Sequence, residues 1–374
     1  MKRYPFLDLA EINARYSRQL REAATRVIDS GRYIGGEENR DFERNLSAFI
    51  GGGCEAVGCG NGYDALFLIL KAYMEMGRLT IGDEVIIPAN TFIATVLSVV
   101  NAGLKPLLVD PDPGTMNLSG KIAAPALTPR TRALITVHLY GSPAWDEEML
   151  LLATDKGILV IEDAAQAIGA SALNAGINGN FAVGSLGHAA AFSFYPTKNL
   201  GALGDGGAVV SSDAELCRTV RQIANYGSDR RNHYRYLGVN SRLDPIHAAM
   251  LSEKLKDLPE VNNRRRQRAT LYGSLIDNPL VRTPYNPGSV WHQYVVRIGS
   301  GRRDDFRDYL ASNGVETDVH YPVPPHRQPC LSYLTHPPLP FTETLASEIV
   351  SLPISDCTSL DDVIEISAII NNFK

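Results

Sequence analysis

The sequence predicts an α/β fold built around a mainly parallel β-sheet, followed by a smaller α+β domain. Short apolar segments alternate with helical segments over more than half of the chain, which is typical of strands joined by helical crossovers. These segments are continuous apolar runs, such as TRALITV at 131–137, and such runs indicate strands that are buried on both faces. From residue 292 the alternation changes character. We therefore expect a large domain with an N-terminal arm over residues 1–245 and a small domain over residues 246–374.

Two helices are expected before the first strand. Residues 10–30 place apolar side chains at helical spacing, and this helix ends at Gly31. Residues 39–50 form the second helix, with Asn39 as its expected N-cap and the three glycines at 51–53 as its end.

A glycine turn then connects the first strand to an apolar helix. The strand is expected at 56–59, the turn Gly-Asn-Gly at 60–62 and the helix at 64–76. Such a turn can bind an anion, because free backbone N–H groups and the helix dipole point to the same place. A plain β–α connection uses glycine equally often, so the turn alone does not decide between the two interpretations.

The pattern of strand, loop and helix repeats down the chain. Further strands, each a short apolar run, are expected at 84–87, 105–109, 131–137, 158–161, 190–194, 208–211, 293–298 and 316–320. Further helices are expected at 93–102, 146–156, 214–224, 246–258, 260–275, 304–313 and 360–371. Several residues with functional side chains or glycine follow strands directly: Gly60, Phe92, His138, Asp163 and Lys198. Ligands bind beyond the carboxyl ends of the strands in such sheets, so we expect a functional site where these residues meet.

Composition excludes several classes of function. The 374 residues carry a net charge of −5, which argues against a general nucleic-acid-binding surface. The five cysteines are widely spaced and form no CxxC pair, so we expect neither a disulfide framework nor a metal site. The start MKRYPFLDL lacks the apolar core of a signal peptide, and no apolar run is long enough for a membrane span. A cytoplasmic enzyme is expected.

Residues 189–212 hold a single lysine, Lys198, between two apolar runs and among several glycines. One interpretation is a solvated loop lysine, as most lysines are. The other is a partly desolvated amine with a lowered pKa, able to form a Schiff base. The local residues leave both interpretations open.

Asp163 closes an apolar strand, so its carboxylate faces burial and needs a partner. A structural arginine or backbone amides would serve for an isolated aspartate. Beside a Schiff-base lysine, the protonated nitrogen of a pyridinium ring is another candidate. Phe92 could stack on that ring and Gln166 could bind its hydroxyl edge, while Ser193 and the glycine turn could hold a phosphate. Together these residues indicate pyridoxal 5′-phosphate as the cofactor.

Six segments resemble signature segments of the DegT/DnrJ/EryC1/StrS sugar aminotransferases. They are GNGYDAL (60–66), PANTFIAT (88–95), EDAAQAIGA (162–170), FSFYPTKNLGALGDGGAVV (192–210), GVNSRLDPIHAAML (238–251) and HYPVPPH (320–326). The resemblance implies the aspartate aminotransferase fold (pyridoxal phosphate fold type I), whose large cofactor-binding domain has a mainly parallel seven-stranded sheet. It further implies a homodimer, L-glutamate as amino donor, a nucleotide-linked keto sugar as acceptor, and a role in making O-antigen sugars of lipopolysaccharide.

The resemblance also assigns roles to individual residues. Lys198 would form the Schiff base and move protons, and Asp163 would pair with the pyridine nitrogen. The remaining cofactor contacts would come from Gly62, Tyr63, Phe92, Gln166 and Ser193, and from Asn240 of the neighbouring subunit. This chain has Tyr63 where many members have Thr or Ser, and Asp205 lies in GALGDGG rather than in the commoner GEGG ending. A backbone N–H contact survives the first change, whereas a short hydroxyl contact does not.

The polar stretch 225–243 is too polar for a core and too rich in tyrosine and arginine for a linker. Guanidinium groups suit a diphosphate, and aromatic rings suit a base or a sugar face. We therefore expect substrate contacts from Tyr226, Arg230 and Arg231, with His320 and His326 at the rim of the site. The tract at 72–94 resembles enzymes that act on dTDP-linked 6-deoxyhexoses. The expected activity is VioA-like amination of dTDP-4-keto-6-deoxy-D-glucose, and the alternative is amination at C3 of a 3-keto isomer.

Two other classes of function, a nicotinamide-dependent oxidoreductase and a regulator without catalysis, fit the sequence less well. A nicotinamide-dependent oxidoreductase would use the glycines at 58–62 as a dinucleotide loop, but the third glycine of GxGxxG is replaced by Tyr63. Tyr195 and Lys198 are one residue too close for a dehydrogenase pair, and Pro196 between them argues against a regular helix. A regulator without catalysis would have lost Lys198 or Asp163, and both are present.

Overall fold

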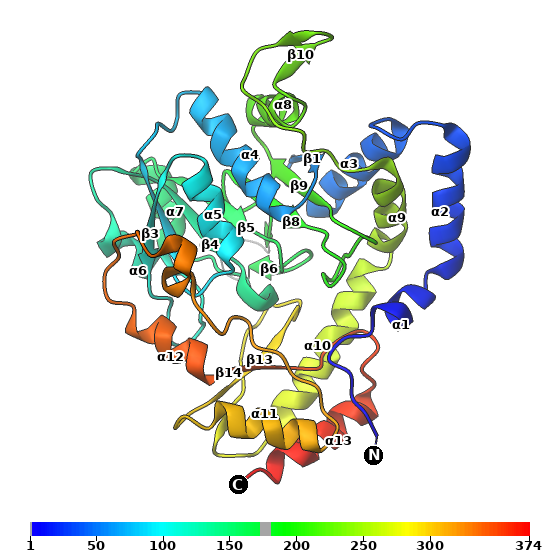
Figure 1. Ribbon diagram of the computed structural model, residues 1–374, viewed down its shortest axis with the longest axis vertical. Coiled ribbons are helices and arrows are strands. Elements are labelled where there is room, and N and C mark those ends of the chain that lie inside the picture. The colour runs from blue at the N-terminus through cyan, green and yellow to red at the C-terminus, as the bar shows by residue number, and fades with distance from the viewer. Residues whose placement is uncertain (1, 173–180) are drawn as a thin grey trace.

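A seven-stranded sheet forms the centre of the molecule in the computed structural model, which describes residues 2–172 and 181–374 (Figure 1). The strands lie in the order β1-β9-β8-β5-β4-β2-β3. Their bounds are β1 Glu55–Cys59, β2 Glu84–Pro88, β3 Lys105–Val109, β4 Thr131–Val137, β5 Leu159–Asp163, β8 Ala189–Ser193 and β9 Gly207–Ser211. Only β9 runs antiparallel to its neighbours. The predicted α/β fold with a mainly parallel sheet is confirmed.

Helices cover both faces of this sheet, because successive side chains of each buried strand point to opposite faces. On β4, for example, Ile135 packs with one set of helices and Leu134 with another. The first face is covered by α4 Gly62–Glu75, α5 Ile93–Asn101 and α8 Ala214–Ile223. The opposite face is covered by α3 Glu37–Ile50, α6 Gly120–Ala123, α7 Glu147–Asp155 and α9 Pro245–Leu255.

The N-terminal region differs from the expected pair of helices in two details. The single helix expected over 10–30 is divided into α1 Leu9–Ala14 and α2 Ser17–Ser30, with Tyr16 outside helical geometry between them. Gly36, rather than Asn39, caps α3, and Asn39 Nδ2 donates to the carbonyl of Leu243 at 2.7 Å. That amide fastens α3 to the segment before α9. Asn39 is not the cap because the helix already begins at Glu37.

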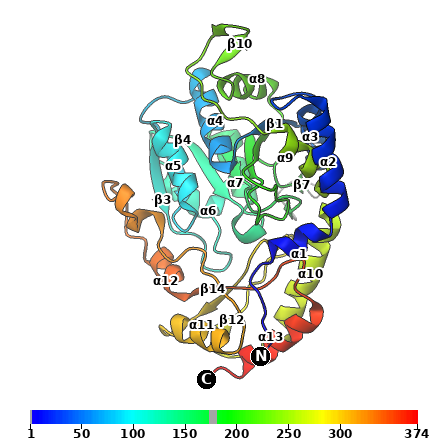
Figure 2. The same ribbon diagram turned by 45° about the vertical axis from the view of Figure 1, so that its right-hand side comes forward.

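A three-stranded antiparallel sheet lies at the lower end of the molecule in both views (Figures 1 and 2). It consists of β12 Val281–Arg282, β13 Tyr294–Ile298 and β14 Ile349–Leu352. The helices α10 Leu258–Leu275, α11 Arg303–Ser312 and α13 Leu360–Asn371 pack against it through their own hydrophobic core. The prediction of a strand at 316–320 is wrong, because this segment forms only one isolated bridge, from Asp318 to Ser351.

Helix α9, which begins at the expected domain boundary, packs into the core of the large sheet. Helix α10 then runs from that region to the small sheet (Figure 1). The limits of the two domains therefore stay a prediction.

The remaining strands and α-helix are β6 Ser171–Ala172, β7 Phe181–Ala182, β10 Ser228–Arg230, β11 His233–Tyr234 and α12 Pro340–Glu348. Within 2–172 and 181–374, no helix is both long and apolar enough to cross a membrane.

Candidate active site

A cavity of about 430 Å³ lies beyond the carboxyl ends of the parallel strands. Asp163 is the last residue of β5 and pairs with Val137 on β4 and with Ala191 on β8. Ser193 ends β8, so both side chains reach the same edge of the sheet. The predicted residues that line this cavity are Gly62, Tyr63, Phe92, Asp163, Gln166, Ser193, Lys198 and His320. Of the five residues expected to meet beyond the strand ends, Phe92, Asp163 and Lys198 line this cavity, whereas Gly60 and His138 do not. His138 is fully buried and lies 2.9 Å from Glu162 instead.

Lys198 lies in a tight loop between β8 and β9. Its backbone N–H donates to the carbonyl of Tyr195 at 2.8 Å. A Cβ at position 201 would lie only 2.3 Å from the carbonyl oxygen of Pro196, so the loop requires Gly201 there. The next side chain, Asn199, donates to Asn262 Oδ1 at 2.9 Å. The loop that carries the lysine is therefore fixed to the body of the protein.

Burial lowers the pKa of Lys198 from 10.5 to about 8, and the charge of Asp163 opposes this shift. Desolvation disfavours the ammonium form, so a substantial fraction of the amine is neutral near neutral pH. Of the two interpretations left open by the sequence, the structure supports the desolvated amine. Such an amine can act as a nucleophile and can accept a proton.

Asp163 is buried and has no cation within ion-pair distance among the residues that the structure describes. Its Oδ2 accepts a hydrogen bond from Thr95 Oγ1 at 2.8 Å, and its Oδ1 accepts one from the N–H of Ala165 at 3.2 Å. Burial raises the pKa of Asp163, while these two hydrogen bonds and the charge of Lys198 oppose the rise. A cationic group placed against this carboxylate would stabilise its ionised form.

The first turn of α4 forms the part of the cavity next to Ser193. A Cβ at Gly62 would lie 2.7 Å from Ser193 Cβ, so only glycine permits this close approach. Asn61 caps the helix by accepting from the N–H of Asp64 at 2.8 Å. The hydroxyl of Tyr63 accepts from Asn101 Nδ2 at 2.7 Å. The backbone N–H groups of this first turn are donors that suit a phosphate, because they have no partner within the helix.

Phe92 and Gln166 border the cavity from two further loops. Phe92 is half exposed, and its ring centroid lies 5.1 Å from that of Tyr321. Gln166 Oε1 accepts from the N–H of Tyr140 at 2.5 Å, and its Nε2 donates to the hydroxyl of Tyr321 at 3.0 Å. These contacts fix the amide of Gln166 at the cavity wall.

Several predicted contacts lie away from this cavity. Tyr226, Arg230, Arg231 and Asn240 are exposed on or beside the β10–β11 hairpin, which projects beyond α8 at the top of Figure 1. His326 is buried, with Nε2 3.2 Å from Glu343 Oε1, and is not among the residues that line the cavity. The substrate contacts expected from Tyr226, Arg230, Arg231 and His326 stay predictions, and so does the cofactor contact expected from Asn240.

Other residues of the cavity wall were not singled out from the sequence. They are Thr95, which binds Asp163, and the lining residues His292, Gln293 and Tyr321. Thr95 and Tyr321 lie inside the quoted segments PANTFIAT and HYPVPPH, which was the available signal. Asp205, whose role the sequence left open, also lines the cavity.

The residues of this cavity suit pyridoxal phosphate. A lysine amine of lowered pKa, a buried carboxylate without a cation and a glycine-permitted helix N-terminus match the aldehyde, ring nitrogen and phosphate of that cofactor. The fold and the cavity therefore define an enzyme that depends on pyridoxal phosphate.

Comparison with known proteins specifies the family. The chain belongs to the DegT/DnrJ/EryC1/StrS aminotransferase family, whose pattern it matches over residues 15–371. It is 44% identical to the dTDP-3-amino-3,6-dideoxy-α-D-galactopyranose transaminase of Aneurinibacillus thermoaerophilus over 372 residues, covering 99% of both chains. It is 41% identical to the dTDP-3-amino-3,4,6-trideoxy-α-D-glucose transaminase of Streptomyces venezuelae, covering 94% of this chain and 91% of that one.

Solved structures agree with this assignment. DesV of S. venezuelae has a TM-score of 0.91 at 39% identity and covers 99% of this chain and 98% of its own. NtdA from Bacillus subtilis, solved with bound cofactor PMP, has a TM-score of 0.88 at 28% identity, covering 100% of this chain and 86% of its own. The protein is a pyridoxal-phosphate-dependent nucleotide-sugar transaminase whose acceptor is a nucleotide-linked keto sugar. The oxidoreductase considered from the sequence receives no support.

Proposed function

We propose that the chain transfers an amino group from L-glutamate to C3 of a dTDP-linked 3-keto-6-deoxyhexose. The observation that carries this proposal is the 44% identity, over 99% of both chains, to a transaminase named for a dTDP-3-amino-3,6-dideoxy sugar. A second relative at 41% identity is also named for a 3-amino sugar. The C4 amination first expected from the sequence has less support, because neither name describes a 4-amino product.

The position of amination can be tested directly. The purified enzyme with L-glutamate is given either a dTDP-3-keto-6-deoxyhexose or dTDP-4-keto-6-deoxyglucose, and NMR locates the carbon that bears nitrogen. We expect a 3-amino product from the first sugar and little conversion of the second. Lys198→Ala serves as the inactive control. Conversion of the 4-keto sugar alone would contradict the proposal and would support amination at C4 instead.

In the proposed reaction, the chain's own groups hold the reactants and move one proton. The bound cofactor supplies an electron-withdrawing ring that makes the proton beside the transferred amine acidic. Nζ of Lys198 takes this proton as a base and returns it as an acid, a role that suits an amine with a pKa of about 8. Lys198→Ala is therefore expected to abolish turnover while leaving the fold intact.

Asp163 is proposed to face the ring nitrogen as an anion. Asp163→Asn can keep both hydrogen bonds, since Thr95 Oγ1 also lies 2.8 Å from Thr91 Oγ1 and can change its donor direction. The variant removes charge with little change in shape, and we expect turnover to fall by about tenfold to a hundredfold, the value of a charged hydrogen bond. Single-turnover kinetics with unchanged cofactor content would support this role. Wild-type turnover would make Asp163 merely structural.

The other cofactor contacts are proposed from their position in the cavity. The backbone N–H groups of Gly62 and Tyr63 and the hydroxyl of Ser193 would hold the phosphate. The half-exposed ring of Phe92 would stack on the cofactor ring, and the fixed amide of Gln166 would meet its hydroxyl edge.

We further propose a homodimer with shared sites. Asn240 and the hairpin residues Tyr226, Arg230 and Arg231 are exposed and lie outside the cavity of their own chain. A two-fold partner would bring them to the other subunit's cavity. Mixed Lys198→Ala and Asn240→Ala subunits should then recover part of the activity, since one hybrid site holds both intact residues. Heterodimers that exchange but stay inactive, although the Asn240→Ala homodimer is clearly impaired, would refute the shared site.

A further inference from the structure

A second, smaller cavity lies directly beside the main one. It has a volume of about 160 Å³, which is more than a single water needs. Four residues line both cavities: Thr197, His292, Gln293 and His320. The charge of Lys198 acts on His292 and His320, so a group bound in this side cavity lies near the reactive amine.

Arg265 of α10 forms part of the wall of the side cavity. It is almost completely buried, and only its Nη1 donates hydrogen bonds to described residues, to the carbonyls of Trp291 at 3.1 Å and His292 at 3.3 Å. Its buried Nε has no partner within 2–172 and 181–374. Burial lowers the pKa of Arg265 to about 10, so the guanidinium remains charged at neutral pH. A buried guanidinium charge without a carboxylate partner is costly unless an anion is bound.

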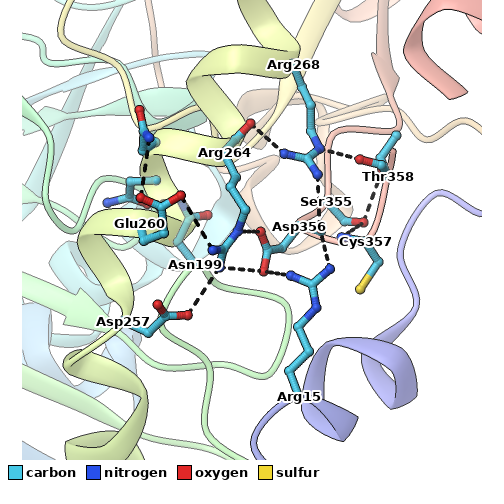
Figure 3. Close-up of polar contacts among 12 residues, drawn as sticks. Arg15, Asn199, Asp257, Glu260, Arg264, Arg268, Ser355, Asp356, Cys357 and Thr358 are labelled. Atoms are coloured by element: carbon cyan, nitrogen blue, oxygen red, sulfur yellow. Dashed lines mark hydrogen bonds and ion pairs between the residues drawn. The ribbon is translucent and has the colours of Figure 1, made fainter. Parts of the chain in front are cut away.

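Neighbouring arginines bind the buried carboxylate of Asp356, as Figure 3 shows. Arg264 Nε donates to Asp356 Oδ1 at 2.6 Å, and Arg15 Nη1 donates to Asp356 Oδ2 at 2.5 Å. Arg268 donates to backbone carbonyls, including that of Arg264 at 2.7 Å. Asp356 still acts on Arg265 through space but makes no hydrogen bond to it in the part of the chain that the structure describes. Arg265 is thus left without a carboxylate of its own.

The other groups around the side cavity favour an anion as well. Burial and the nearby charges of Lys198 and Arg265 hold the pKa of His292 well below its ordinary value. Burial and Lys198 also lower the pKa of His320, while Asp318 opposes that shift. Asp318 is the one carboxylate among the described residues of the wall, and its side chain is 58% exposed. Both imidazoles are therefore favoured in their neutral form, and an anion bound here would face the positive charges of Lys198 and Arg265.

We propose that the side cavity binds a carboxylate of the amino donor on the guanidinium of Arg265. This proposal rests on the proposed function, in which an α-amino dicarboxylic acid must bring its α-carbon to Nζ of Lys198. The side cavity has room for a carboxylate but is much smaller than the main cavity, which would hold the cofactor and the reacting part of the sugar. Arginine is well suited to this task, since its planar fork can donate two parallel hydrogen bonds to one carboxylate.

The two half-reactions separate this proposal from a structural role of Arg265. In the donor half-reaction, holoenzyme is mixed with L-glutamate alone; in the acceptor half-reaction, enzyme already carrying the amino group is mixed with the keto sugar. Arg265→Gln should raise the KM for L-glutamate at least tenfold and change the acceptor half-reaction less than twofold. Arg266→Gln is the matched control, because Arg266 also binds a backbone carbonyl, that of Ser289 at 3.1 Å, but lines neither cavity. Equal loss in both half-reactions, or in neither, would overturn the proposal.

A second measurement does not depend on the folding of a variant. Glutarate, a dicarboxylate without an amino group, should inhibit the wild-type holoenzyme in competition with L-glutamate. A crystal structure of that complex should place one carboxylate within hydrogen-bond distance of Arg265. Glutarate bound only elsewhere would overturn the proposal. If the donor half-reaction proceeds but no 3-keto sugar is aminated, the proposed acceptor fails while the carboxylate site stands; if no donor half-reaction occurs with L-glutamate, the carboxylate site fails.

Discussion

The acidity of Lys198 can be measured on the cofactor-free chain by competitive labelling with acetic anhydride between pH 6 and 11, read by mass spectrometry. With a pKa of about 8, about a quarter of the Lys198 amines are neutral at pH 7.5. For an ordinary lysine with a pKa near 10.5 the neutral fraction is about one in a thousand, so the difference is about 200-fold. Labelling is expected to follow that neutral fraction, since only the neutral amine is a nucleophile.

Lys254 provides an internal comparison for this experiment. Burial also lowers its pKa to about 8, but its Nζ is buried and donates to the carbonyl of Gly201 at 2.6 Å. Lys254 lies outside the main cavity, whereas Lys198 lines it. We therefore expect Lys254 to titrate in the same range and to be labelled far more slowly.

The charge of Asp163 determines in which direction an Asp163 substitution should change the pKa of Lys198. Asp163 raises the pKa of Lys198 against the effect of burial, so Asp163→Asn should lower that pKa further below 8. Asp205→Asn is the matched control, because Asp205 lines the same cavity but is not among the charges that shift Lys198. A measured pKa near 10.5, or a rise in Asp163→Asn, would refute the reasoning.

Two further predictions concern the cavity and its support. Gly62→Ala would place a Cβ 2.7 Å from Ser193 Cβ, a clash worth about 1–3 kcal/mol, and should weaken cofactor binding about tenfold or more in a spectroscopic titration. Gly299→Ala has open space and should bind normally; equal affinities would contradict the close approach. The buried carboxylate of Glu162 accepts from His138 Nε2 at 2.9 Å and from three backbone N–H groups at 2.8–2.9 Å. Glu162→Gln leaves about two of these four donors unpaired and should cost about 2–6 kcal/mol in urea denaturation; a loss below about 1 kcal/mol would show that the network rearranges.

Elements with a strong local pattern were predicted closely. The strands β3 Lys105–Val109 and β4 Thr131–Val137 and the helix α13 Leu360–Asn371 have the expected bounds. Each is an apolar run or an amphipathic pattern that is bounded by polar or turn residues, so local preference and burial agree. The sequence predicted a strand at 316–320 that does not form, and it did not predict β14 Ile349–Leu352. Strand formation there depends on a partner far away in sequence, which local residue types do not specify.

In the candidate site, too, some residues could be predicted from the local sequence and others could not. Lys198, Asp163 and Ser193 could be found because each lies at or shortly beyond the carboxyl end of a strand, and these ends meet at one edge of a parallel sheet. The contact of Gln166 with Tyr321 joins residues 155 positions apart, and no local pattern indicates it. The side cavity at Arg265 was not predicted either, because an unused guanidinium donor is visible only when every neighbour has been placed.

By itself, the sequence determined the α/β class, the large parallel sheet and the lysine, carboxylate and glycine turn that suit pyridoxal phosphate. These follow from local periodicity and from residue types whose chemistry is intrinsic. Only the tertiary structure decided how far burial lowers the pKa of Lys198, which residues orient Asp163 and Gln166, and which arginine of α10 lines the side cavity. The physical reason is that desolvation and hydrogen-bond pairing depend on everything packed around a group, and most of those neighbours are distant in sequence.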